Sequence, residues 1–404
     1  MSETFAVGVK IDQNHCSRCA ICPSVCPFEA ISIKEKTGEV KLDIEKCQTC
    51  GICSSSCPVL AIETVYYETT SLLSYVERRM RQTGFETLVV MCRGSSSQSK
   101  DIANVLEEQN IHDFISLRLP CVGRLSSQFF VKALALGVKK IVVVECEDYF
   151  CRFKEGSKVA TRRLLATGAL LDQLGFNSGA LAIIRNPLKA VYETKECVGC
   201  GKCEYICPYD AIKLDVFGTP QIDSEACMGC GACAVICPHL AFQLEGYRYE
   251  AVSNLIQDYS MKANRLKSDS KKPVILVFCC QWSEFSALNN PKTGVPKKNV
   301  MIVEIPCFTG LDPTHVLRAF YLGFDGVLVI TCPEDECKLK EGREIAEQNV
   351  SALRKMLKQF NLENRFEICT ASPKYLGEFD SKIDAFVQKI SSLPPIAAGE
   401  RLFV

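Results

Sequence analysis

The sequence predicts a multidomain protein of mixed α/β and α+β class, in which two cysteine-rich modules alternate with two parallel-sheet α/β domains. Three features of the chain support this prediction: four copies of one cysteine string, a duplication of the whole chain, and alternating strand and helix patterns after each pair of strings. The chain has 404 residues, which exceeds one typical core, so we expect several domains.

Each cysteine string reads C-x2-C-x2-C-x3-C-P. The four strings are Cys16, Cys19, Cys22 and Cys26; Cys47, Cys50, Cys53 and Cys57; Cys197, Cys200, Cys203 and Cys207; and Cys227, Cys230, Cys233 and Cys237. Three cysteines at this spacing can wrap one 4Fe-4S cluster, while the fourth reaches the neighbouring cluster. The sequence therefore predicts four 4Fe-4S clusters in two dicluster ferredoxin modules, at residues 1–70 and 187–248.

The exchange of fourth cysteines predicts which ligands hold each cluster. The expected sets are Cys16, Cys19, Cys22 with Cys57; Cys47, Cys50, Cys53 with Cys26; Cys197, Cys200, Cys203 with Cys237; and Cys227, Cys230, Cys233 with Cys207. A structural role for buried apolar cysteines would not explain this regular spacing.

The chain also repeats itself, because the strings and most later cysteines of the first half recur 180 to 187 positions further on. After the first module we expect strands at 88–91, 115–119, 140–145 and 180–184, with helices at 101–109, 128–136 and 156–174. After the second module we expect strands at 274–278, 301–305, 326–330 and 365–368, with helices at 314–321 and 341–360. Alternation of this kind predicts parallel sheets with helical crossovers, in domains at 85–186 and 270–372, followed by a C-terminal extension at 373–404.

The remaining cysteines fall where these strands end. Cys92, Cys121 and Cys146 follow strands of the first domain; Cys279, Cys307 and Cys332 follow strands of the second; Cys151 and Cys337 each close a C-x4-C loop. Because the carboxyl ends of parallel strands share one edge, we expect these thiols to converge there. Four converging thiolates suit zinc or a 2Fe-2S cluster. Cys280 is an additional candidate ligand beside Trp282, and we expect Cys369 to serve packing.

Composition excludes several classes of function. The chain has 47 basic and 47 acidic side chains, so no overall field favours nucleic acid, and the basic stretch 262–272 is interpreted as a solvated linker. The 26 cysteines, without a signal peptide or a membrane-length apolar run, indicate a reducing cytoplasm and no direct membrane insertion. No dinucleotide or phosphate-binding motif occurs, and no histidine supports a nucleophilic cysteine, so we expect no substrate site.

Several segments of both α/β domains resemble the delta subunit of methyl-viologen-reducing hydrogenase. They are Pro120-Cys-Val-Gly-Arg124, Ile141-Val-Val-Val-Glu-Cys146, Lys154-Glu-Gly156, Phe278-Cys-Cys-Gln-Trp282 and Gly326-Val-Leu-Val-Ile-Thr-Cys332. This resemblance implies a domain with a 2Fe-2S cluster that passes electrons to the flavoprotein of heterodisulfide reductase. The first domain departs from the family pattern at Arg93-Gly-Ser, so the second domain is expected to dock the flavoprotein.

Together these features predict an electron-transfer subunit of a large oxidoreductase complex containing a heterodisulfide-reductase-like flavoprotein and other redox subunits. Electron bifurcation in such a complex is compatible with the resemblance. Two alternatives stay open: an adaptor whose α/β domains bind zinc or no metal, and a freely diffusing polyferredoxin. The terminal electron donor and acceptor are not specified by the sequence.

Overall fold

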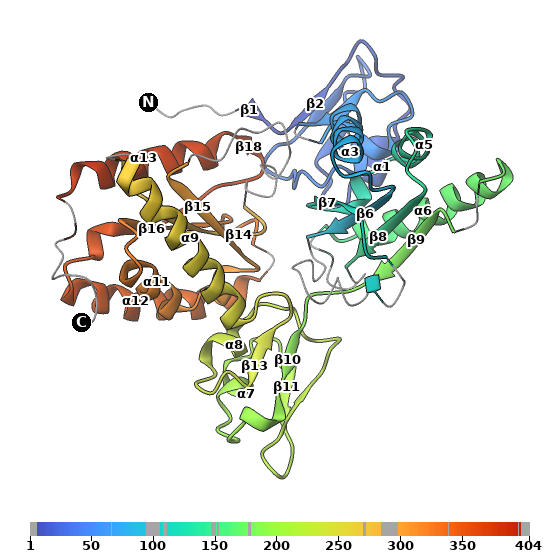
Figure 1. Cartoon of the computed structure of the whole chain (residues 1–404). Helices are drawn as coiled ribbons and strands as arrows, with labels where there is room; N and C mark the ends of the chain where they lie inside the picture. The colour runs from blue at the N-terminus through green and yellow to red at the C-terminus, as the bar shows by residue number, and fades with distance from the viewer. Residues whose placement is uncertain are drawn as a thin grey trace. The chain divides into compact units, whose positions relative to one another are not determined.

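The computed structural model describes residues 6–65, 67–93, 106–107, 111–146, 151, 153–176, 179–269, 272–283, 298–337, 339–394 and 396 (Figure 1). These residues form two units, which are described separately. The first unit extends to Leu188 and includes the short segment Pro373–Leu376. The second unit contains the other described residues from Lys189 onward. Each unit begins with a cysteine-rich module and continues into an α/β domain, which confirms the expected multidomain α/β class and its alternating order.

The two modules share one architecture of short antiparallel strand pairs and five-residue helices. The first contains β2 (Val9–Ile11), α1 (Ile21–Val25), β3 (Ile31–Ile33), β4 (Val40–Leu42), α2 (Ile52–Ser56) and β5 (Ile62–Thr64). The second contains β10 (Ala190–Tyr192), η2 (Thr194–Glu196), α7 (Lys202–Ile206), β11 (Ile212–Leu214), β12 (Pro220–Ile222), α8 (Ala232–Ile236) and β13 (Phe242–Leu244). In each, the first strand pairs with the last and the two inner strands pair together. This pairing gives each module a pseudo-twofold arrangement.

The α/β domain of the first unit has a four-stranded parallel sheet. Its elements are α3 (Thr69–Thr83), β6 (Thr87–Cys92), β7 (Ile115–Leu119), η1 (Val122–Arg124), α5 (Ser127–Ala135), β8 (Lys140–Glu145), α6 (Gly156–Gln173) and β9 (Leu181–Arg185). The strand order is β7-β6-β8-β9, so the chain crosses β6 between β7 and β8. These strands agree with the sequence prediction, whereas most of the helix expected at 101–109 lies outside the described residues. A short strand, β1 (Ala6–Val7), pairs with β18 (Tyr375–Leu376) in this unit.

The α/β domain of the second unit repeats this topology with the strand order β15-β14-β16-β17. Its elements are α9 (Tyr249–Asp269), β14 (Ile275–Cys280), β15 (Val300–Ile305), η3 (Phe308–Gly310), α11 (Pro313–Tyr321), β16 (Gly326–Thr331), α12 (Lys340–Gln359), η4 (Glu363–Arg365), β17 (Phe366–Thr370) and α13 (Glu378–Ser392). All neighbouring strands are parallel. In both sheets the second strand along the chain lies on one side of the first strand, and the third lies on the other side. Open α/β sheets bind ligands at the carboxyl end of such a switch point.

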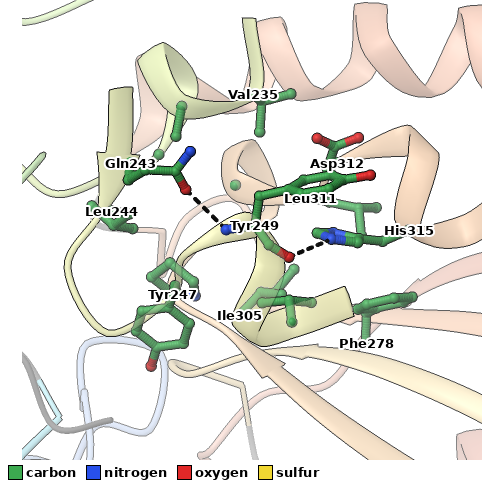
Figure 2. Close-up of a pocket in the computed structure, with 15 residues that line it drawn as sticks. Val235, Gln243, Leu244, Tyr247, Tyr249, Phe278, Ile305, Leu311, Asp312 and His315 are labelled. Carbon is green, nitrogen blue, oxygen red and sulfur yellow. Dashed lines mark hydrogen bonds between the residues drawn. The ribbon is translucent and has the colours of Figure 1, made fainter. Parts of the chain in front are cut away.

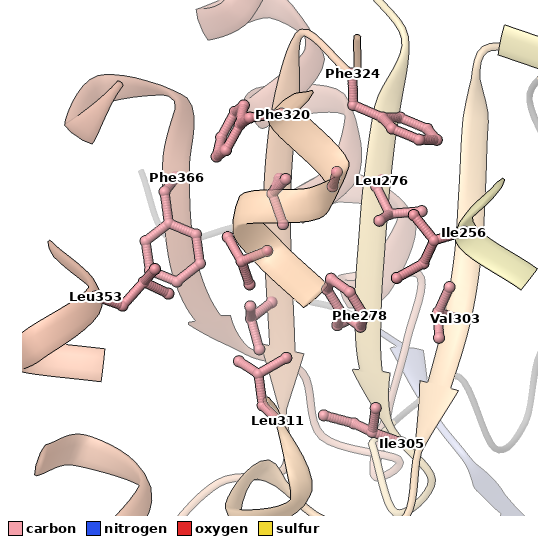
Figure 3. Packing of buried hydrophobic residues seen from close by; sticks show 14 of the residues in the cluster. Ile256, Leu276, Phe278, Val303, Ile305, Leu311, Phe320, Phe324, Leu353 and Phe366 are labelled. Carbon is pink, nitrogen blue, oxygen red and sulfur yellow. The ribbon is translucent and has the colours of Figure 1, made fainter. Parts of the chain in front are cut away.

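Both faces of the second sheet are covered. Figure 3 shows Leu276, Phe278 and Val303 packed with Ile256 of α9 and Leu353 of α12 in one buried cluster. On the opposite face, a Cβ atom at Gly326 would lie within 3.0 Å of side-chain atoms of Phe386 and Ile390 from α13. Successive residues of a strand point to opposite faces of the sheet. Residues of β14 two positions apart, such as Leu276 and Phe278, therefore share one face.

The basic stretch 262–272 is not a linker, which corrects the sequence interpretation. Residues up to Asp269 belong to α9, and Ala263 is fully buried in the core of the second unit. Lys267 donates to the Gly323 carbonyl at 2.6 Å and to Asp325 at 2.7 Å. The sequence interpretation gave weight to the basic side chains of this stretch, but the segment is part of an amphipathic helix whose apolar side packs on the sheet. No helix within the described ranges is both long and apolar enough to cross a membrane.

Candidate metal centres

Backbone geometry in the cysteine strings directs N–H groups toward sulfur. Cys16, Cys47 and Cys197 each accept from the amide two residues later, at 3.4, 3.4 and 3.3 Å respectively. Cys26 and Cys57 each accept from the amide four residues later, at 3.3 and 3.2 Å. Such bonds stabilise thiolates, since an N–H donor favours the charged form of its acceptor.

The strings lie close together in the pattern that the sequence predicts. The pKa of Cys22 is raised to about 11 by burial and by the nearby charges of Cys16, Cys19 and Cys57. The pKa of Cys53 is raised by burial and by Cys50, Cys47 and Cys26. In the second unit, Cys197, Cys200, Cys203 and Cys237 line one small cavity, and Cys233 lies near Cys230, Cys227 and Cys207. In each set, the fourth cysteine of one string stands beside the first three of the other.

The two strings of each module differ in exposure. The middle cysteines of the first string in each module, Cys19 and Cys200, are exposed to solvent. Their counterparts in the second string, Cys50 and Cys230, are buried, and burial raises the pKa of each to about 12. Each module thus has an outer string and an inner string, and a buried thiolate of the inner string requires compensating positive charge such as that of iron.

Four thiols converge at the edge of the first sheet. Cys92 ends β6 and its Sγ lies 3.7 Å from the Sγ of Cys146, which follows β8. Cys121, after β7, and Cys146 both donate hydrogen bonds to Cys151, which lowers the pKa of Cys151 to about 3. The same bonds, together with burial, raise the pKa of Cys121 and Cys146. Cys151 thus accepts the hydrogen bonds of two neighbouring thiols, which favours its thiolate, the metal-binding form.

Two glycines allow this approach of sulfur atoms. A Cβ atom at Gly156, the first residue of α6, would lie 2.7 Å from the Sγ of Cys121 and 3.2 Å from that of Cys151. A Cβ atom at Gly123 would lie 2.5 Å from the Gly156 carbonyl oxygen. A side chain at Gly156 would displace the thiols, and one at Gly123 would displace the backbone of Gly156.

The corresponding edge of the second sheet uses Cys280 rather than Cys279. Cys332 is hydrogen-bonded to Cys280 and Cys337, and Cys307 to Cys337; these bonds and burial raise the pKa of Cys332 and Cys307. Cys279 instead places its Sγ 3.7 Å from the Val303 carbonyl oxygen. Adjacent residues of β14 point to opposite faces of the sheet, so both cannot face this edge. The register agrees, since Cys280 pairs with Ile305 as Cys92 pairs with Leu119.

Within each unit, the inner string lies against the thiol group of the α/β domain. In the first unit, the electrostatic neighbours of Cys121 include Cys50. In the second unit, Cys230 and Cys307 belong to one buried cluster, together with Leu339 and the partly buried Cys337. The same arrangement therefore occurs in both halves of the duplicated chain.

Sequence reasoning missed the polar groups at these junctions. Arg124 and Arg163 in the first unit, and Thr309 in the second, are placed beside the thiols by the fold. Alignment of the two halves of the sequence would have drawn attention to the two arginines, because the positions that correspond to Arg124 and Arg163 are Gly310 and Asn349. Within the described ranges, no group of three or more His, Cys, Asp or Glu side chains is arranged to hold a single metal ion.

Comparisons with known proteins match both kinds of region. Residues 87–196 and 275–394 match the family of methyl-viologen-reducing hydrogenase, delta subunit. Residues 15–61 and 196–241 match the 4Fe-4S dicluster domain. These matches confirm the resemblance inferred from the motifs and show that the chain carries 4Fe-4S clusters in two dicluster domains.

Two kinds of curated relative are similar to the chain. One subunit of the ferredoxin:CoB-CoM heterodisulfide reductase of Methanosarcina mazei is 29% identical over 281 residues, which is 67% of this chain and 31% of that protein. The chain thus spans about a third of the length of this relative. The iron-sulfur subunits of the vhu F420-non-reducing hydrogenases are 29% identical over 126 residues in Methanocaldococcus jannaschii and 28% over 131 residues in Methanopyrus kandleri. These matches cover 30% and 32% of this chain, and 94% and 99% of the two relatives. With its two matching regions extending over more than half of its length, the chain belongs to the methyl-viologen-reducing hydrogenase delta subunit family.

Proposed function

We propose that the chain is an iron-sulfur electron-transfer subunit that relays electrons to or from a heterodisulfide-reductase-like flavoprotein in a larger oxidoreductase complex. The observation that carries this proposal is the close approach, in each unit, of the inner cysteine string to the thiol group of the α/β domain. Relatives that are named as heterodisulfide reductase and hydrogenase subunits support the choice of partners.

The proposed relay has the same order in both units. Electrons enter or leave at the outer cluster, where Cys19 or Cys200 is exposed. They pass through the buried inner cluster to the sheet-edge site of the α/β domain. Transfer between neighbouring clusters needs no bond making, so the protein contributes by holding the clusters close and by setting their potentials through charge, hydrogen bonds and exposure.

At each sheet edge we propose a 2Fe-2S cluster with four cysteine ligands. The ligands would be Cys92, Cys121, Cys146 and Cys151 in the first unit, and Cys280, Cys307, Cys332 and Cys337 in the second. Cys279 is left out of the second set because it faces the other side of the sheet. The ferredoxin-type clusters would take the four crossed ligand sets expected from the sequence.

The metal content of the purified chain tests the proposal. Four 4Fe-4S clusters and two 2Fe-2S clusters would contribute about 20 iron atoms per chain, with no stoichiometric zinc. Anaerobic purification followed by elemental analysis measures both metals. A reproducible content of about 16 iron atoms and two zinc ions would instead support an adaptor whose α/β domains bind zinc. Purification without any redox partner would favour a freely diffusing polyferredoxin.

Replacement of Cys57 by serine tests the crossed ligand sets. Because Cys57 stands beside Cys16, Cys19 and Cys22, the variant should alter the cluster of the first string, although residue 57 belongs to the second. Paramagnetic resonance spectra of the reduced variant distinguish the two clusters. Cys26→Ser is the matched variant, and it should alter the cluster of Cys47, Cys50 and Cys53. A Cys57→Ser spectrum with changes only in the second string's cluster would contradict the exchange.

A further inference from the structure

A buried arginine lies between the inner string and the sheet-edge thiols of the first unit. Arg124 ends η1, is only 8% exposed, and places its guanidinium carbon 4.3 Å from the ring centre of Tyr67. Its Nη2 donates to the Thr49 carbonyl at 2.7 Å, within the inner string. Gly51 provides the space, because a Cβ atom there would lie 2.6 Å from the Cβ of Arg124.

A second arginine reaches the same junction from α6. One nitrogen of Arg163, Nη1, donates to the Ser55 hydroxyl at 2.8 Å and to the carbonyls of Gly123 and Leu125 at 2.9 and 2.8 Å. The other, Nη2, donates to the Ser56 hydroxyl at 3.0 Å. Arg163 thereby connects α2, the helix within the inner string, to the segment that follows Cys121.

The negative groups that face both arginines are mainly the cysteines themselves. Burial lowers the pKa of Arg124, and the opposing interactions come from Tyr67, Cys121 and Cys50. Burial also lowers the pKa of Arg163, opposed by Cys121. Neither guanidinium forms an ion pair with a carboxylate of the described residues. An arginine remains protonated in proteins, so both positive charges persist beside the thiolates.

The second unit has no such charge at the equivalent place. Counting from the matching cysteines, Arg124 corresponds to Gly310 and Arg163 to Asn349. Gly310 lines a cavity of about 40 Å³ together with Gly231 and Tyr247, the counterparts of Gly51 and Tyr67. Figure 2 shows residues that line this cavity, with Tyr247 and Asp312 among those labelled. The serines bound by Arg163 correspond to two apolar residues, one of which, Val235, also lines the cavity.

Acidic groups stand near this cavity instead. Asp312 lines it and caps α11 by accepting from the Thr314 amide at 2.8 Å. The hydroxyl of Tyr247 donates to the buried Glu304 at 3.4 Å. In the first unit, Ser126 and Arg118 occupy these two positions. The two junctions are therefore alike in fold, but the two positive side chains of the first have no counterpart in the second.

We propose that Arg124 and Arg163 raise the reduction potentials of the inner cluster and the sheet-edge site of the first unit above those of the second unit. This inference rests on the proposed electron-transfer function. One-electron reduction adds one negative charge to a cluster, and a fixed positive charge nearby stabilises that reduced form. The electron comes from a reduced cluster or an external reductant, and the arginines keep their protons. At a given solution potential the clusters of the first unit are then reduced before those of the second.

The test is a potentiometric titration of the full chain, loaded with clusters and followed by paramagnetic resonance. In Arg124→Gln, the reduced-to-oxidised ratio of the first unit's inner cluster should fall about tenfold at a fixed potential, which is about 59 mV for one electron. Arg124→Lys should retain most of the wild-type potential because the charge remains. Arg162→Gln is the matched control, since this neighbour on α6 is exposed and should leave the potentials unchanged.

An unchanged potential in a fully loaded Arg124→Gln variant would overturn the inference, as would an equal shift in Arg162→Gln. If Arg124→Gln does not assemble its clusters, titration of the wild-type chain decides. The two sheet-edge sites should then reduce in separate steps, and a single step for both would overturn the inference. A wild-type chain that binds no clusters at the sheet edges would contradict the proposed function itself, which is a different outcome.

Discussion

Replacing Cys332 by serine is expected to abolish electron delivery from the second α/β domain to the proposed flavoprotein partner, while the four ferredoxin-type clusters remain intact. Cys332 is buried between Cys280 and Cys337, and a serine oxygen is a poorer ligand for an iron-sulfur cluster than a thiolate. The second domain is the proposed exit because Cys280 and Trp282 keep more of the family's first-strand signature than Arg93 and Gly94 of the first domain do. Cys307→Ser should have the same effect.

The rate of flavin reduction in the reconstituted complex measures this loss. Cys369→Ser is a suitable control because Cys369 lies on β17 and is not among the four converging thiols. This control should transfer electrons at the wild-type rate. Undiminished rates in both Cys332→Ser and Cys307→Ser would make the second domain dispensable, and the exit would then be the first domain, around Cys121 and Cys146.

Gly156→Ala is expected to eliminate the cluster proposed for the sheet edge of the first unit. The new methyl group would lie 2.7 Å from the Sγ of Cys121, so the thiol or the start of α6 must move. Overpacking of this kind typically costs about 1–3 kcal/mol, and the displaced ligand should reduce the iron content by about two atoms per chain. Chemical denaturation of the chain and elemental analysis measure the two effects.

Gly168→Ala provides the matched control on the same helix. A Cβ atom at Gly168 would meet no atom within 4 Å, and alanine in a helix interior is more stable than glycine by about 0.5–1 kcal/mol. This variant should keep its iron and gain stability. If Gly156→Ala behaved in the same way, the close approach of α6 to the thiols would not be essential for cluster binding.

The strand pattern of the α/β domains was predictable because buried parallel strands are continuous apolar runs. The strands expected at 115–119 and 140–145 have those bounds in the structure, and the others differ at their ends by one or two residues. Charge was a weaker guide. The basic side chains in the stretch 262–272 suggested a linker, yet Ala263 and the rest of the apolar face of α9 pack on the second sheet. A periodic apolar face outweighs exposed charge in stabilising a helix.

The cysteine strings, their spacing and the duplication establish the chemistry of this chain from its sequence alone, because cluster ligation by such a string is local in the chain. The proposed sheet-edge ligands are not local, and only the tertiary structure distinguishes Cys280 from Cys279, since strand register decides which thiol lies beside the other three. The charge beside each relay also depends on the fold. Arg124 lies over 70 residues from Thr49 in sequence, and only packing of η1 against the inner string brings its charge to the cluster site.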